Sequence, residues 1–91
     1  MPYPPVTVLI PAYNAARTIK RALTSVWRQN YPEMEVIVVD DGSDDDTSLH
    51  VRGIGNGNIR LLRLEKNRGV SGAMNVGIQE ARTDYILPGC R

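Results

Sequence analysis

Two short runs of β-branched, almost continuously apolar residues constrain the fold of this chain more than any other feature. Residues 6–10 read VTVLI, and residues 36–39 read VIVV. Strands buried on both faces have this composition, and they are typical of parallel sheets. Consecutive parallel strands need a crossover of a dozen or more residues, which is usually helical. The sequence therefore predicts a strand, a helical crossover and a second strand.

The segment between the two runs carries the pattern of an amphipathic helix. Its apolar residues recur at i, i+3, i+4, i+7 and i+8 and form one stripe: Ile19, Ala22, Leu23, Val26 and Trp27. Asn14 stands where a helix N-cap is expected, and Pro11 is expected to help end the first strand. We therefore predict a helix over residues 15–29, with Asn30-Tyr31-Pro32 ending it.

The alternation continues after the second strand. Ser43 and Asp46 resemble a capping box, which predicts a second helix. That helix should span only about two turns, because glycines interrupt it: Gly53, Gly55 and Gly57. A third strand is predicted over residues 59–64.

A third helix is predicted over residues 71–81, and a fourth strand over residues 85–87 that ends at Pro88-Gly89. The inward face of the third helix is expected to hold Ala73, Val76, Gly77 and Ala81. The order β-α-β-α-β-α-β predicts an α/β fold of three layers, α/β/α, with a mainly parallel, doubly wound sheet of about four strands.

The bulk properties limit the classes of function. A chain of 91 residues with a net charge of +1 is one small domain, with no electrostatic case for binding nucleic acid or a membrane surface. The single cysteine, Cys90, allows no intrachain disulfide and fits a cytoplasmic location. The start of the chain does not resemble a signal peptide, and the apolar runs are too short to span a bilayer.

Polar segments follow three of the predicted strands, at residues 11–14, 40–43 and 67–69. Ligands of doubly wound sheets bind outside the carboxyl ends of the strands, where the strand order reverses. Side chains alternate along a strand, so either Asp40 or Asp41 is expected to point into this crevice while the other braces backbone. A carboxylate there can accept an N–H from a base or hold a metal; alternatively, both acids cap the following helix.

The other two polar segments also allow two interpretations each. The ring of Tyr13 can stack on a planar base or pack over the start of the helix. Asn67-Arg68-Gly69 can place a cation and an amide near a diphosphate, or form a plain turn in which Gly69 supplies an unusual backbone angle. No G-x-x-x-x-G-K-[ST] or G-x-G-x-x-G motif follows the first strand, which counts against P-loop and dinucleotide-binding proteins.

Three runs taken together resemble the N-terminal half of family 2 glycosyltransferases, which are inverting enzymes of the GT-A fold. The runs are residues 6–14, 31–43 and 67–77, and the resemblance covers roughly residues 6–87. It implies a glycosyltransferase that moves a sugar from a nucleotide-diphospho-sugar, most often a UDP-sugar, to an acceptor hydroxyl. This chain would supply the nucleotide-binding part.

The resemblance also implies roles for individual residues. The nucleotide base pocket would be lined by Pro11, Ala12 and Tyr13, and Asp41 would bind the base. The sugar-diphosphate site would be bordered by Asn67, Gly69 and Asn75. The family often has an arginine where Met74 stands, and Arg68 is the candidate to supply the missing cation.

The end of the sequence departs from the family pattern. The resemblance implies a divalent metal, Mn or Mg, held by an Asp-x-Asp motif after the last strand, but Pro88-Gly89-Cys90-Arg91 contains no acid. We therefore expect residues 1–91 to be a single partial domain without metal ligands, catalytic residues or the acceptor half. An exposed sheet edge or face predicts self-association, and a longer form could associate with membranes. The alternative is a non-catalytic nucleotide-binding or oligomerising interaction module derived from the same fold.

Overall fold

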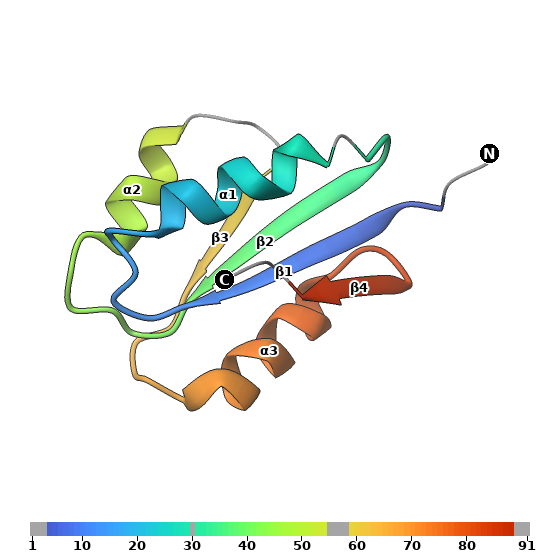
Figure 1. Ribbon diagram of the computed structural model, residues 1–91. Helices are drawn as coiled ribbons and strands as arrows, with labels where there is room; N and C mark the ends of the chain where they lie inside the picture. Colours follow the sequence, from blue (N-terminus) through green and yellow to red (C-terminus); the bar gives the residue numbers. More distant parts are fainter. Residues whose placement is uncertain (1–3, 30, 55–58, 89–91) are drawn as a thin grey trace.

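The fold is given by a computed structural model that describes residues 4–29, 31–54 and 59–88. The elements alternate as predicted (Figure 1). They are β1 (Val6–Ala12), α1 (Ile19–Arg28), β2 (Met34–Asp40), α2 (Thr47–Ile54), β3 (Ile59–Arg63), α3 (Gly69–Glu80) and β4 (Tyr85–Pro88). The predictions made on Asn30, Gly55, Gly57 and residues 89–91 lie outside the described residues.

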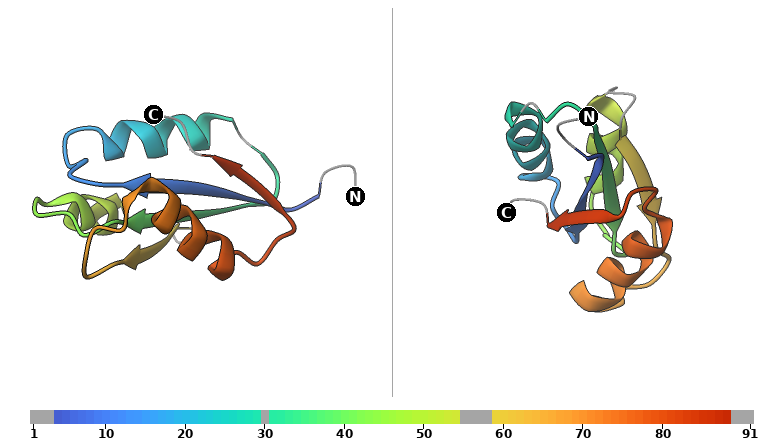
Figure 2. Two further views of the ribbon diagram at one scale, coloured as in Figure 1. Left: turned by 90° about the horizontal axis from the view of Figure 1, so that it is seen from below. Right: turned by 90° about the vertical axis from the view of Figure 1, so that its right-hand side faces the viewer.

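The strands form one parallel sheet in the order β3-β2-β1-β4. Helices α1 and α2 cover one face and α3 covers the other, so the chain has the three predicted layers (Figures 1 and 2). The chain runs outward from β1 through β2 to β3 and then returns through α3 to the other side of β1. The strand order therefore reverses between β1 and β4. Within the described ranges, no helix is long and apolar enough to cross a bilayer.

The two faces of the sheet are filled by alternate residues of its central strands. Val8 and Ile10 of β1 pack with α1 and α2, whereas Leu9 packs with Ala73 of α3. On the α3 side the helix packs very close to the sheet. A Cβ added at Gly77 would lie only 2.1 Å from Leu9 Cδ1. The inward direction predicted for Ala73 and Gly77 is confirmed, since both are buried.

The sequence predicts that Pro11 helps to end β1. That prediction is wrong, because the strand runs through Ala12. The carbonyl of Ala12 accepts a hydrogen bond from the Asp41 N–H on the β2 side. Because backbone groups alternate between the two sides of a strand, Pro11 faces the opposite side, where pairing with β4 has stopped at Leu9. The missing N–H of Pro11 therefore costs the ladder no hydrogen bond.

Helix α1 begins at Ile19, four residues later than predicted, and Asn14 is not its N-cap. Asn14 has a left-handed backbone, with φ 49°, and its Oδ1 accepts from the N–H of Asp44 instead of a helical N–H. Residues 15–18 form a turn in which Ala15 O accepts from the N–H of Thr18. The predicted apolar stripe is confirmed for Ile19, Leu23, Val26 and Trp27, which lie in the core or pack against it, while Ala22 is half-buried outside that cluster.

The predicted capping box before α2 is also wrong. The helix begins at Thr47, whose N–H is accepted by Asp45 Oδ1 at 3.0 Å, while Ser43 Oγ accepts the N–H of Asn14. Its predicted length of about two turns is confirmed by its eight residues. Helix α3 starts at Gly69, two residues early, and this glycine has the unusual angle expected of it, φ 81°.

Candidate functional site

A groove lies at the point where the strand order reverses. Strand β4 is the shorter partner, and its pairing with β1 ends at Leu9 and Pro88, whereas β1 continues to Ala12. The free edge of β1 therefore opens into a hollow of about 1190 Å³ between the two helical layers. Its lining comes from β1 and the loop after it (Ile10, Pro11, Ala12, Tyr13, Ala15), from the start of α1 (Thr18, Ile19, Ala22), from α3 (Val70, Met74) and from β4 (Pro88).

The structure places the predicted site residues in two connected groups and leaves one apart. Pro11, Ala12 and Tyr13 line the groove, and the ring of Tyr13 is half exposed, at 50%. Asp41 lies next to them, because its N–H donates to Ala12 O at 2.8 Å. Asp41 also contacts Asn67 and Arg68, as described below. Asn75 lies further along α3, is exposed, and is not among the groove residues.

Sequence reasoning missed the part of the groove that comes from the helices. Thr18 and Val70 line it, yet Thr18 reads as an ordinary polar residue and Val70 as an ordinary apolar one. Only the topology could have found them, because the groove forms between α1 and α3 on opposite faces of the sheet. Met74, which stands where the family often has an arginine, lines the groove. This side of the hollow is therefore apolar.

Asp40 and Asp41 separate as the alternation of a strand predicts. Asp40 turns toward α2, where Oδ1 accepts from the Ser43 N–H at 2.9 Å and Oδ2 accepts from the hydroxyl of Ser48. Arg63 Nη1 lies 3.4 Å from Oδ2. Burial alone raises the pKa of Asp40, but the two serine donors and the charge of Arg63 outweigh it and hold the pKa below its usual value. Asp40 is therefore the residue that braces backbone.

Asp41 turns the other way, toward the loop before α3. Its side chain is only 3% exposed, and Oδ1 accepts from the Arg68 N–H at 2.7 Å, while its carbonyl accepts from Asn67 Nδ2 at 3.2 Å. The other carboxylate oxygen, Oδ2, accepts no hydrogen bond from the residues that the structure describes. Asp41 thus keeps one acceptor free at the edge of the sheet where the groove lies.

Gly42 allows the loop before α3 to approach this closely. Its φ is 76°, and a Cβ added there would lie 2.8 Å from the backbone N of Asn67 and 3.0 Å from the carbonyl carbon of Lys66. A side chain at this position would be strained and would also collide with backbone. The glycine of the sequence Asp40-Asp41-Gly42-Ser43 is therefore needed for the contact between Asp41 and Arg68.

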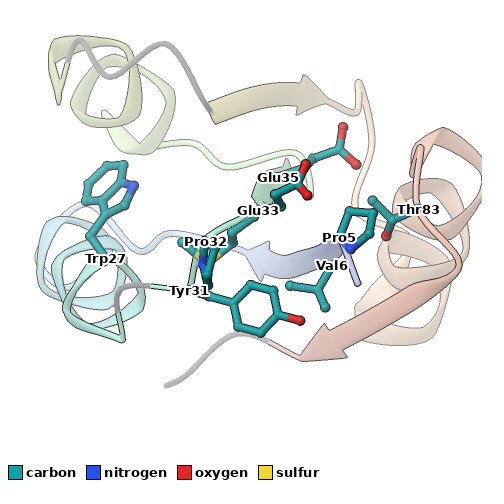
Figure 3. Close-up of a pocket in the computed structure, with 9 residues that line it drawn as sticks. Pro5, Val6, Trp27, Tyr31, Pro32, Glu33, Glu35 and Thr83 are labelled. Atoms are coloured by element: carbon teal, nitrogen blue, oxygen red, sulfur yellow. The ribbon is translucent and has the colours of Figure 1, made fainter. Parts of the chain in front are cut away.

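A smaller hollow of about 440 Å³ lies at the other edge of the sheet (Figure 3). It is lined at the starts of β1 and β2 by residues such as Val6 and Glu35, together with Trp27 from α1. The indole N–H of Trp27 is buried without a hydrogen-bond partner in the described part of the chain. Ligands of parallel α/β sheets bind at the carboxyl edge, so the larger groove is the candidate site.

The described residues do not fit a metal ion by themselves. In that part of the chain, no three His, Cys, Asp or Glu side chains are grouped closely enough to hold one. Asp41 offers a single free oxygen, and both oxygens of Asp40 accept hydrogen bonds.

The order and packing of the strands and helices are those of GT-A glycosyltransferases. The mannosyltransferase PcManGT from Pyrobaculum calidifontis, solved with GDP-Man and Mn²⁺, superposes with a TM-score of 0.85 and 32% identity over 91% of this chain. TarS 1-349 from S. aureus, solved with UDP, superposes with a TM-score of 0.84 and 34% identity over 92% of this chain. Both fold and sequence are thus shared with these enzymes.

The chain belongs to glycosyl transferase family 2, whose pattern matches residues 7–88. The succinoglycan biosynthesis protein ExoO of Rhizobium meliloti (strain 1021) is 46% identical over 83 residues, or 91% of this chain. The match covers 24% of ExoO and 26% of each of the two structures just described. This chain thus spans about a quarter of the length of the relatives it matches.

Proposed function

We propose that this chain is the donor-binding part of a family 2 glycosyltransferase and that it binds the nucleotide of a nucleotide-diphospho-sugar. A UDP-sugar is the expected donor. The whole enzyme would transfer the sugar to an acceptor hydroxyl during synthesis of a surface polysaccharide. The observation that carries the proposal is Asp41. Its free Oδ2 is not among the buried side-chain atoms that lack a partner in the described residues, so this oxygen can be reached from outside, and the ring N–H of uracil or guanine is a donor that it can accept.

The other predicted residues have roles around that contact. Pro11 and Ala12 would form the wall of the base pocket, and the half-exposed ring of Tyr13 would stack on the base. The loop Asn67-Arg68-Gly69 would lie near the diphosphate, with the Arg68 guanidinium as its cation. Asn75 would border the sugar-diphosphate site. A nucleotide needs a concave site with a few fixed polar groups, and the groove beside Asp41 has that form.

The relatives support the class of ligand, while the roles of the individual residues stay predictions. GDP-Man and Mn²⁺ in PcManGT, and UDP in TarS, are the classes of ligand and metal that the proposal requires for the whole enzyme. Self-association through β4 also stays a prediction. That strand forms the edge of the described sheet and exposes about half of the Tyr85 and Leu87 side chains. The cytoplasmic location expected from the sequence is likewise a prediction.

The test removes one acceptor without changing the shape of the site. In Asp41→Asn an amide oxygen can still accept the Arg68 N–H, but an NH₂ group replaces the free oxygen. Titration calorimetry with UDP should show affinity weakened at least about tenfold, because a hydrogen bond to a charged group is lost. Asp84→Asn, an exposed acid at the opposite edge of the sheet, is the matched control and should bind as the original protein does.

A modified nucleotide provides the complementary test. The ring nitrogen of 3-methyl-UDP carries no proton, so this compound should bind the original protein about as weakly as UDP binds Asp41→Asn. Equal affinity for UDP and 3-methyl-UDP would contradict the role of Asp41. Absence of binding to UDP, UDP-glucose and GDP, with and without Mn²⁺, would favour the alternative of an interaction module.

A further inference from the structure

The loops that follow β1 and β2 are joined by four hydrogen bonds, which we call the loop clasp. Three consecutive backbone N–H groups, of residues 14, 15 and 16, donate to side-chain oxygens of Ser43, Thr47 and Asp45 at 2.8, 2.8 and 3.1 Å. The fourth bond runs in the other direction, from the Asp44 N–H to Asn14 Oδ1 at 2.8 Å. The clasp thus ties two loops that are about 30 residues apart in sequence.

Asn14 suits its place in the clasp for a conformational reason. Its φ of 49° lies in the left-handed region, which Asn enters more readily than most residues because its short amide can bond to nearby backbone. Here both its N–H and its Oδ1 are used by the second loop. The backbone immediately after Tyr13 is therefore fixed in an unusual direction by contacts with a distant part of the chain.

The far side of the clasp is itself firmly held. The Ser43 N–H donates to Asp40 Oδ1, and the Ser43 carbonyl accepts a hydrogen bond from Arg63 Nη2 at 3.1 Å. Thr47 is fully buried, and its hydroxyl donates to Asp45 Oδ1 while accepting from the Ala15 N–H. The first loop is therefore fastened to a rigid support rather than to another loose segment.

Tyr13 stands between two such fixed points. On one side, Ala12 is buried and paired with β2 through the Asp41 N–H. On the other side, Asn14 is held by the clasp. The Tyr13 ring is half exposed in the groove, so its direction depends on its backbone more than on side-chain packing.

We propose that the loop clasp orders the Tyr13 ring for its ligand, with Asn14 and Ser43 as positioning residues that act through Tyr13. The inference rests on the proposed function, since the ligand is a nucleotide base. A ring that is already oriented gives up less conformational freedom when a base stacks on it. Loss of the clasp should therefore weaken base binding while the bond between Asp41 and Arg68 remains.

The experiment is a double-mutant cycle read by calorimetry with UDP. Asn14→Gly keeps the left-handed backbone accessible but deletes Oδ1, and it should weaken binding about fivefold. Tyr13→Ala should weaken binding about tenfold or more. In the Tyr13→Ala background, Asn14→Gly should change the affinity less than twofold, because the residue through which it acts is gone. A general loss of structure would instead weaken binding equally in both backgrounds.

Two further variants make the result decisive. Ser43→Ala removes the acceptor of the Asn14 N–H and should repeat the Asn14→Gly result if that variant folds poorly. Asp44→Asn changes the same loop but leaves the clasp intact, since only the backbone N–H of Asp44 takes part, and it should bind UDP as the original protein does.

Hydrogen exchange supplies a readout that needs no ligand. The amides of residues 14–16 should exchange slowly in the original protein and at least about tenfold faster in Ser43→Ala. Fast exchange in the original protein, unchanged UDP affinity in both clasp variants, or equal effects in the two Tyr13 backgrounds would each overturn the inference. Failure of the original protein to bind any nucleotide would instead overturn the proposed function, and the ligand role of the clasp with it.

Discussion

The two edges of the sheet both carry a carboxylate network, but the networks differ in what they leave unused. At the amino edge, Glu35 Oε2 accepts from the Thr7 hydroxyl at 2.7 Å and from the Arg82 N–H at 3.0 Å. Arg60 bonds to Glu35 Oε1 at 3.4 Å and to Glu80 Oε1 at 2.9 Å. These bonds tie the end of α3 and the start of β4 to the centre of the sheet.

The carboxyl edge is also polar, yet two of its groups are free to bind something else. Asp41 keeps one oxygen without a donor from the described residues, and Tyr13 exposes half of its ring. A polar cluster whose members all bond to one another stabilises a fold, whereas a cluster with unused acceptors at a hollow is suited to a ligand. By this criterion Glu35, whose two oxygens both have donors, is a structural carboxylate, whereas Asp41 is the candidate for a binding carboxylate.

The largest expected effect is that of Gly42→Ala, which damages the carboxyl edge itself. The added Cβ meets the backbone of Asn67 at 2.8 Å on a residue with φ 76°, so we expect a loss of about 3 kcal/mol in the free energy of unfolding. UDP binding should be lost together with the contact between Asp41 and Arg68. Urea denaturation and calorimetry measure the two effects.

Gly53→Ala is the control for that variant. It lies in α2, and a Cβ there has no atom within 4 Å, so alanine should be neutral or stabilise by up to about 1 kcal/mol. If Gly42→Ala unfolded at the same urea concentration as Gly53→Ala, the close approach of the two loops would be wrong.

Glu35→Gln should affect stability but not binding. Burial alone raises the pKa of Glu35, but bonds from Arg82, Thr7 and Arg60 outweigh it and lower the pKa below its ordinary value of 4.5. The ionised group therefore stabilises the fold above that value, and this stability is lost as the pH falls through the lowered pKa. We expect Glu35→Gln to lower the free energy of unfolding by about 2 kcal/mol at neutral pH. The stability of this variant should also fall less steeply as the pH is lowered.

The measurement is urea denaturation at neutral pH and at a series of pH values below 4.5, over which the ionised form is lost. Exposed Glu33, on the same edge, supplies the control Glu33→Gln, which should retain the stability of the original protein at neutral pH. A change of more than about twofold in UDP affinity for Glu35→Gln would break the distinction between the edges.

The smallest expected effect is that of Asp45→Asn in the loop clasp. The bond from the Thr47 hydroxyl, with those from the Ala16 and Thr47 N–H groups, lowers the pKa of Asp45, while its slight desolvation acts in the opposite direction. An asparagine has one acceptor oxygen, which can keep the bond from the Ala16 N–H only if its NH₂ group replaces the oxygen that faces Thr47, so UDP affinity should weaken by no more than about threefold. Asp45→Ala should weaken it more. Equal losses in the two variants would mean that charge, not hydrogen bonding, holds the clasp.

The order of elements and the location of the site could be predicted because they depend on local patterns. Apolar runs mark the buried strands, and topology places the loops after them at one edge. The boundaries could not be predicted where distant contacts decide them. Asn14 follows an ordinary N-cap pattern, but its bonds to Ser43 and Asp44 delay α1 by a turn. Pro11 stays in β1 because pairing with β4 stops at Leu9.

The separation of the two acids was predictable in part. Alternation requires that Asp40 and Asp41 face opposite sides, but only the packing of α2 and of the loop before α3 decides which acid faces which. The family resemblance named Asp41, and its geometry is consistent with that choice. The roles of all the site residues stay predictions: Pro11, Ala12 and Tyr13 line the groove, whereas the other predicted residues are not among its lining.

Because Asp40 and Asp41 point in opposite directions, the function of each acid depends on whether its position along β2 is odd or even. Whether an acid faces α2 or the loop before α3 is set by an odd or even count of residues along β2. Inserting one residue between Val36 and Asp40 would turn each acid toward the opposite side of the strand. An engineer who lengthens this strand, or grafts it into another protein, must therefore add or remove residues in pairs.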